Sequence, residues 1–126
     1  PDLLSEAAAR EDVAELVTGQ RNLFFARTES IQRQTEQLNK RVEQTRNQII
    51  GITAQQTSLA RQLEFIEQEL EVQQSLFERG LTQASGVLAL QREAASLDGQ
   101  LGELAAPKAQ SEQRITEIEI EVLRLG

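Results

Sequence analysis

The sequence has no cysteine, histidine, methionine, tryptophan or tyrosine, and it contains only four phenylalanines and two prolines in 126 residues. Without cysteine and histidine, the chain cannot form the usual structural zinc sites, a thiol nucleophile or a Ser–His–Asp triad. It cannot form a disulfide, so cysteine content gives no evidence about its compartment. A globular core of this size ordinarily carries more aromatic residues. These absences favour long helices over a compact enzyme, and we expect no catalytic residue, no cofactor and no metal.

Charge and hydropathy exclude two further classes of protein. The chain has 20 acidic and 13 basic residues, for a net charge of −7. This balance disfavours nucleic-acid binding, which depends on Lys and Arg contacts to phosphates. No apolar run approaches the roughly 18 to 20 residues of a membrane-spanning helix, and no secretory signal opens the chain. We expect neither a nucleic acid nor a small-molecule substrate as a partner.

The two ends of the chain suggest a piece of a longer protein. The sequence opens with Pro1 instead of methionine, and it stops directly after the apolar residues Val122 and Leu125. We expect residues 1–10 to form a lead-in segment and the second helix described below to be truncated at its C-terminus.

A heptad pattern runs through the first half of the chain and predicts a helix over residues 11–78. This stretch contains no proline, and Glu11 and Asp12 place negative charge in the expected first turn, which suits the helix dipole. Apolar and small polar residues recur in steps of three and four, as in the seam of a coiled coil. The seam comprises Val17, Phe24, Thr28, Ile31, Thr35, Leu38, Val42, Thr45, Ile49, Ile52, Gln56, Leu59, Leu63, Ile66, Leu70, Gln73 and Phe77.

A short turn over residues 79–82 precedes a second helix, predicted over residues 83–125. Gly80 can adopt the left-handed conformation that closes a helix, and the hydroxyl of Thr82 can cap the next one. The second helix has its own seam, and Pro107 is expected to kink or break it. This seam comprises Val87, Leu90, Ala94, Leu97, Leu101, Leu104, Lys108, Ser111, Ile115, Ile118, Val122 and Leu125.

The two seams share one register, because the numbers of facing residues add to 160, as for Leu63 and Leu97. Two helices joined by so short a turn run antiparallel. The sequence therefore predicts an all-α fold, a long antiparallel two-helix coiled-coil hairpin. Residues before about Thr35 have no partner within the chain. We expect their apolar side chains to pair with a continuation of the second helix or with another chain.

The residues around the turn form the candidate site for contact with another protein. Two interpretations of its apolar side chains are open: they close the end of the hairpin on one another, or they meet a partner. Arg79 likewise either bonds the last carbonyls of the first helix or contacts that partner. The candidate tip comprises Leu76, Phe77, Arg79, Gly80, Leu81, Thr82 and Ser85.

The many carboxylates offer no comparable site. Glu64, Glu67 and Glu71 share one helix face, as do Glu117 and Glu121. On a slender hairpin such faces are solvated, with no cavity to exclude water from a reaction. We interpret them as exposed helix surface.

Several stretches resemble the helical hairpin of the HlyD-type membrane fusion proteins, the periplasmic adaptors of type I secretion systems. The stretches Leu76–Thr82, Leu88–Ala95 and Leu97–Leu104 resemble most the branch that exports proteases and lipases. Val13–Leu16 and Gln20–Phe24 resemble that branch's start of the first hairpin helix. The resemblance covers nearly the whole chain and rests on the running pattern, with no single diagnostic motif.

This resemblance implies a bridging function without enzyme activity. Such adaptors are anchored in the inner membrane of Gram-negative bacteria beside an ABC transporter. Their periplasmic hairpins assemble as a homo-oligomer, typically a hexamer, whose tips meet a TolC-like outer-membrane channel. Family tips often carry an Arg, then a Leu, then a Ser or Thr. Thr82 matches the hydroxyl and Leu76 approximately matches the Leu, whereas the Arg has no counterpart.

Two other functions are compatible with a helical hairpin. A purely structural coiled-coil arm, such as that of a chromosome-organising ATPase, explains the heptads equally well but not the glycines of the second helix. A tRNA-reaching arm of a synthetase is disfavoured by the negative charge. We therefore expect an adaptor hairpin, with the structural arm as the alternative.

Overall fold

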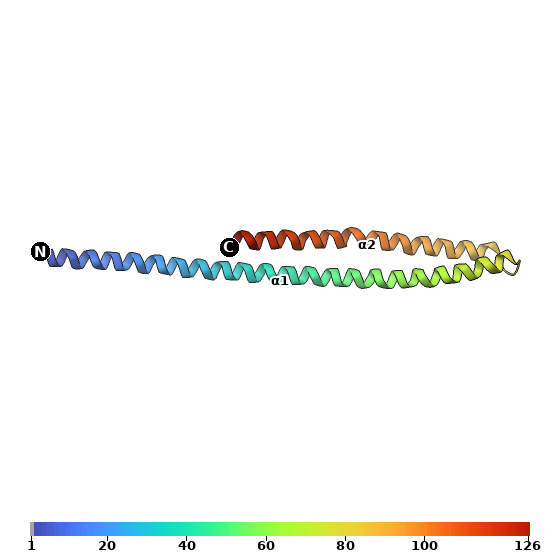
Figure 1. Cartoon of the computed structure of the whole chain (residues 1–126), viewed down its shortest axis with the longest axis horizontal. Helices are drawn as coiled ribbons and strands as arrows, with labels where there is room; N and C mark the ends of the chain where they lie inside the picture. Colours follow the sequence, from blue (N-terminus) through green and yellow to red (C-terminus); the bar gives the residue numbers. More distant parts are fainter. Residues whose placement is uncertain (1) are drawn as a thin grey trace. The chain divides into compact units, whose positions relative to one another are not determined.

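The computed structural model describes residues 2–126, and these residues form two long helices joined by a short turn (Figure 1). Helix α1 spans Asp2–Glu78 and helix α2 spans Ala84–Leu125. The predicted all-α helical hairpin is confirmed. The contacts divide the chain into two compact units. One unit combines the residues through Arg41 with Ile118–Gly126, and the other is Val42–Glu117.

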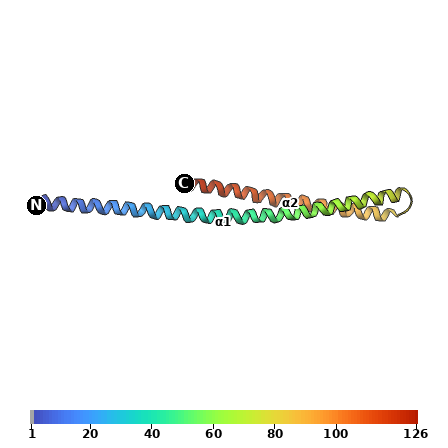
Figure 2. The same cartoon turned by 60° about the horizontal axis from the view of Figure 1, so that its bottom comes forward.

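The unit Val42–Glu117 contains the turn and the stretches of α1 and α2 that lie side by side next to it (Figures 1 and 2). Its buried side chains include Val87 and Leu97, together with the polar Thr45 and Ser111. Outside the turn region Leu76–Gly86, every residue of this unit that is not exposed belongs to one of the two predicted seams. The heptad pattern therefore identified the packed face of both helices.

Contacts across this unit agree with the register in which facing residue numbers add to 160. A Cβ atom placed on Gly86 would lie 3.7 Å from Oε1 of Gln73. Further from the turn, Leu59 of α1 and Leu104 of α2 line the same shallow hollow. The antiparallel pairing of the two helices is confirmed, and the exact register of the layers stays a prediction.

In the other unit, α1 is solvent-exposed along most of its length. Every described residue before Ile31 is exposed, whereas Leu38 and Ile118 are buried. Leu38 lines a hollow with Leu125 of α2. The expectation that residues before about Thr35 have no partner within the chain is confirmed for residues 2–30. The predicted seam members Val17, Phe24 and Thr28 are exposed as a result.

The helices differ from the predicted boundaries at the start of each helix, and α2 begins at Ala84 instead of Gln83. Helix α1 begins at Asp2 instead of Glu11, so the described part of the expected lead-in is helical. The three alanines at positions 7–9 have the highest helix propensity of any residue, which favours this extension. Pro1 lies outside the described residues.

Helix α2 continues through Pro107 without the break that was one expected outcome. Proline has no N–H, so the carbonyl of Glu103, four residues before Pro107, loses its usual donor. Both residues are exposed. Water can therefore reach the carbonyl that the missing N–H leaves unpaired. The kink remains a prediction.

Candidate functional site

The turn that ends α1 is built around Gly80, whose φ angle is +71°. The N–H of Leu81 donates to the carbonyl of Leu76 at 2.8 Å, and the N–H of Gly80 donates to the carbonyl of Phe77 at 2.9 Å. These two bonds define a Schellman motif, which favours glycine at the left-handed position. The turn therefore pairs terminal backbone groups of α1 internally, and Gly80 has the role that the sequence predicted.

Helix α2 begins at Ala84, which makes Gln83 and not Thr82 the residue at the N-cap position. The carbonyl of Gln83 accepts a hydrogen bond from the N–H of Gly86 at 3.2 Å. The prediction that Thr82 caps the second helix is therefore wrong by one residue. Thr82 is half-buried in the turn, and Ser85 lies exposed in the first turn of α2.

The three apolar side chains of the tip differ in their exposure. Leu76 is half-buried, whereas Phe77 is 46% exposed and Leu81 is 67% exposed. The seam was predicted to end at Phe77, but its last half-buried member is Gln73, and the half-buried Leu76 lies outside it. The register places Gln83 opposite Phe77, and Gln83 lies in the turn before α2 begins, so no helix covers Phe77. Because Leu81 is 67% exposed, most of its side chain does not pack against the rest of the hairpin.

Arg79 lies at the end of α1 with its side chain exposed. Within the described residues 2–126, its guanidinium makes no hydrogen bond or ion pair. The carbonyls of Leu76 and Phe77 already accept backbone N–H groups of the turn. The interpretation in which Arg79 bonds the last carbonyls is therefore not observed, and the cation is available at the tip.

The acidic residues of the two helices form no site of their own in the described part of the chain. Glu64, Glu67, Glu71, Glu117 and Glu121 are all exposed. No group of acidic side chains among residues 2–126 is arranged to hold a metal ion. No helix within the same residues is long and apolar enough to span a membrane.

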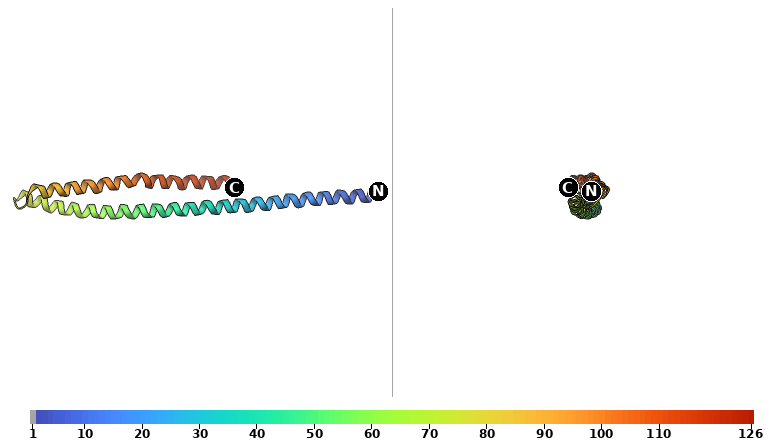
Figure 3. Two further views of the ribbon diagram at one scale, coloured as in Figure 1. Left: turned by 180° about the vertical axis from the view of Figure 1, so that it is seen from behind. Right: turned by 90° about the vertical axis from the view of Figure 1, so that its right-hand side faces the viewer.

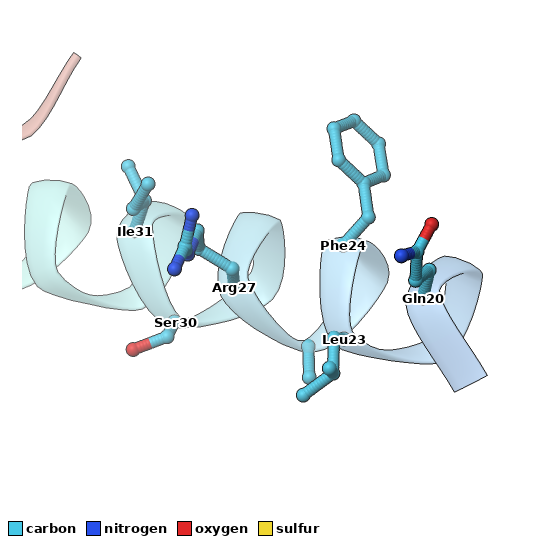
Figure 4. Close-up of a pocket in the computed structure, with 7 residues that line it drawn as sticks. Gln20, Leu23, Phe24, Arg27, Ser30 and Ile31 are labelled. Carbon is cyan, nitrogen blue, oxygen red and sulfur yellow. The ribbon is translucent and has the colours of Figure 1, made fainter. Parts of the chain in front are cut away.

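A second exposed apolar region, which is not part of the tip, lies on α1 in the unit that contains the N-terminal residues. Phe24 and Ile31 point to the same side of the helix, while Leu23 and Ser30 point to the opposite side (Figure 4). The ring of Phe24 packs edge-on against Phe25, with the ring centres 5.9 Å apart. This region contains the apolar residues that the sequence predicted to lack a partner.

Comparison with known proteins places these features in a family context. The family described as "AprE, long alpha-helical hairpin" matches residues 1–126. The chain is also similar to the type I secretion system membrane fusion protein PrsE of Rhizobium meliloti (strain 1021). The identity is 31% over 122 residues, which is 97% of this chain and 28% of that relative. No solved structure matches the chain.

Proposed function

This chain belongs to the AprE family of long α-helical hairpins, and from that premise we propose that it is the hairpin of a periplasmic adaptor in a type I secretion system. The similarity to a protein named as a membrane fusion protein supports this function. The chain spans 28% of the length of that relative, so the activity and partners of a whole adaptor belong to the proposal. Neither comparison supports the alternative, an arm of a chromosome-organising ATPase.

In this proposal the adaptor links an inner-membrane ABC transporter to a TolC-like outer-membrane channel of a Gram-negative bacterium. The hairpin lies in the periplasm, acts as one copy of a homo-oligomer, such as a hexamer, and has no enzymatic function. The candidate tip, Leu76 to Ser85, docks on the periplasmic end of the channel.

The exposure of Leu81 at the end of the hairpin carries this proposal. A leucine that is 67% exposed next to a hydrogen-bonded turn leaves apolar surface for a partner to cover. Complete burial of such a side chain is worth about 1.5–3 kcal/mol, and a partial contact is worth less. Several copies arranged around one channel would multiply weak tip contacts through avidity. Arg79 and Thr82 add polar groups at the same position.

Replacement of Leu81 by aspartate in the full-length adaptor tests the docking. We expect secretion of the transported protein to be lost, because a charge enters the proposed contact. The melting temperature of the hairpin should change little, because Leu81 is exposed. The matched control is Ala89→Asp, which introduces the same charge at an exposed position of α2 outside the tip and should preserve secretion. Normal secretion by the Leu81→Asp variant would remove the tip from the mechanism. A large fall in its melting temperature would show instead that Leu81 closes the hairpin.

A further inference from the structure

Two heptad rows that take no part in the seam are free of charge in the unit Val42–Glu117. We label the heptad positions a to g, with a and d in the seam. The c row of α1 and the b row of α2 both point away from the other helix. All their members in this unit are uncharged and exposed, whereas the b row of α1 contains Glu43, Glu64 and Glu71. The two uncharged rows comprise Gln44, Gly51, Ser58, Phe65 and Val72 on α1, and Leu88, Ala95, Gly102, Ala109 and Thr116 on α2.

The two uncharged rows have their members at the same heights along the hairpin. Val72 lies level with Leu88, because their numbers add to 160 like those of the seam layers. By the same count, Ser58 lies level with Gly102. Small residues meet at two of these heights, Gly51 with Ala109 and Ser58 with Gly102, and the large Phe65 lies at the height of the small Ala95. Small facing residues allow two helices to approach closely.

The two rows face opposite sides of the hairpin. In an antiparallel pair of helices, the e positions flank each other on one side and the g positions flank each other on the other side. The c row lies next to g, and the b row lies next to e. One copy can therefore present its c row to the b row of a second copy, while both hairpins point in the same direction. Such a contact is heterologous, and it leaves a free row on each copy for further neighbours.

Gly51 and Gly102 have no evident function within the chain. A Cβ atom at either position would meet no atom within 4 Å, and neither glycine has a positive φ angle. A glycine inside a helix costs about 1 kcal/mol relative to alanine. Glycine does, however, allow the backbone of a neighbouring helix to approach closely. Both glycines lie in the uncharged rows, where a second hairpin would make that approach.

The α1 surface around Ser58 is hollowed between two larger apolar side chains. Ile50 and Phe65 are the first and last of its lining residues along α1, and the small residues Ala54 and Ser58 lie between them. Phe65 is 55% exposed. The hollow is lined by Ile50, Ala54, Thr57, Ser58, Arg61 and Phe65, among others. Two of its lining residues, Ser58 and Phe65, belong to the c row, and Ser58 lies level with Gly102 of α2.

Charges of opposite sign flank the two rows at matching heights. When the rows meet, the f positions of α1 lie beside the e positions of α2, and the g positions of α1 lie beside the f positions of α2. Arg61 is then level with Asp98, and Glu69 is level with Arg92. Within residues 2–126, none of these four side chains makes an ion pair. The two surfaces are therefore complementary in charge as well as in shape.

We propose that a second copy of this chain docks side by side on the first, with the c row of α1 against the b row of α2. Arg61 pairs with Asp98 of the other copy, and Glu69 pairs with its Arg92. This contact rests on the proposed function in one respect, which is that an adaptor of this kind acts as a homo-oligomer. It uses a surface that is separate from the tip.

Cysteine cross-linking between two separately tagged chains tests this contact directly, because the sequence contains no cysteine. One chain carries Ser58→Cys and the other carries Gly102→Cys. A disulfide requires the two Cα atoms to lie within about 7 Å. We expect oxidation to join the two different chains and to join like chains only rarely. Because a cysteine at Gly102 adds bulk to the contact, Gln44→Cys with Thr116→Cys serves as a second pair.

The matched control combines Ala60→Cys with Gly102→Cys. Ala60 is exposed and belongs to the e row of α1, which lies on the opposite side of the helix from the c row. The yield of this control should be at least about tenfold lower, because the side chains point away from each other. The proposal would be overturned if the control pair and the Ser58–Gly102 pair gave equal yields. It would also be overturned if chains carrying Ser58→Cys joined mainly to each other, or if neither test pair gave a cross-link. Cross-links to a different protein in the full-length adaptor would identify another occupant and would overturn it too.

Charge reversal provides a second measurement. Arg61→Glu in one chain, or Asp98→Lys in the other, should lower the yield of the Ser58–Gly102 cross-link about two- to fivefold at low salt. The two reversals together, one in each chain, should restore it. If the combined variant is no better than either single one, the assigned pairing is wrong.

The outcomes distinguish this proposal from the docking of the tip. In the full-length adaptor, the absence of a cross-link with both test pairs, together with normal secretion, would overturn the lateral contact alone. Normal secretion by the Leu81→Asp variant with the cross-link intact would overturn tip docking alone.

Discussion

Two stretches of α1 carry the same kind of heptad pattern but differ in what covers them. Between Val42 and Gln73, every member of the predicted seam is buried or half-buried. Between Asp2 and Ser30, all residues are exposed, although Val17 and Phe24 continue the same pattern. In the first stretch α2 lies alongside (Figure 3). In the second, no part of α2 covers the side chains.

This difference shows that the pattern selects a face and the partner helix provides the burial. Isolated helices are marginal in water, and most of their stability in proteins comes from packing of one face. The seam residues near the turn should therefore dominate the free energy of unfolding. The apolar residues near the N-terminus should contribute to it only when another helix covers them.

The sharpest test of the paired stretch is a cysteine pair at Leu63 and Leu97, which face each other in the register. We expect nearly complete oxidation within one chain, because facing seam residues lie within disulfide distance. Leu63→Cys with Leu104→Cys is the control, displaced by one heptad, and should not close. Mass spectrometry of the oxidised chains under dilute conditions measures both. Closure of the control pair in place of the first would show that the register is wrong.

Truncation of one leucine in each stretch should separate their energetic contributions. Leu97 is 7% exposed, and Leu97→Ala should lower the free energy of unfolding by about 2 kcal/mol. Leu23 is 72% exposed, and Leu23→Ala should change it by less than about 0.5 kcal/mol. Urea unfolding followed by circular dichroism, at low chain concentration, gives both values. Equal losses would mean that the N-terminal stretch is covered in solution.

Glycine substitutions should have opposite signs in the two regions. Gly80→Ala forces a side chain into the left-handed conformation of the turn and should cost about 1 kcal/mol. Gly19→Ala, inside exposed helix with no atom within 4 Å of the new Cβ, should stabilise the chain by up to about 1 kcal/mol. The melting temperatures of the two variants should lie on opposite sides of the parent value. A stabilising Gly80→Ala would contradict the Schellman turn.

The smallest effect is expected at the junction of the two stretches. Glu29 and Arg33 form an exposed ion pair one helical turn apart, with 4.0 Å between the charged atoms. Glu29→Gln should cost at most about 0.5 kcal/mol, and the difference should vanish in high salt. A loss of 1 kcal/mol or more that persists in high salt would indicate a partner other than Arg33.

The tip shows where the sequence-based prediction reached its limit. The glycine turn was placed correctly because a left-handed residue has a strong sequence signature. The N-cap was assigned to Thr82 because a hydroxyl is favoured there, but the chain enters α2 at Ala84 and leaves Gln83 at that position. The signal for a hydroxyl cap is about one kcal/mol, which the path of the turn readily overrides. The lateral surface was not predicted, because small uncharged residues such as Gly51 and Ser58 form no apolar pattern of their own.

The sequence by itself determined the two helices, the seam residues and the antiparallel pairing of the helices. Period and spacing are properties of the chain, and a helix converts them directly into a face. Only the tertiary structure decided that Leu76 is half-buried while the seam residue Phe77 is exposed, and that Leu81 remains exposed. These outcomes depend on where the second helix begins, because a side chain is buried only when another segment lies over it.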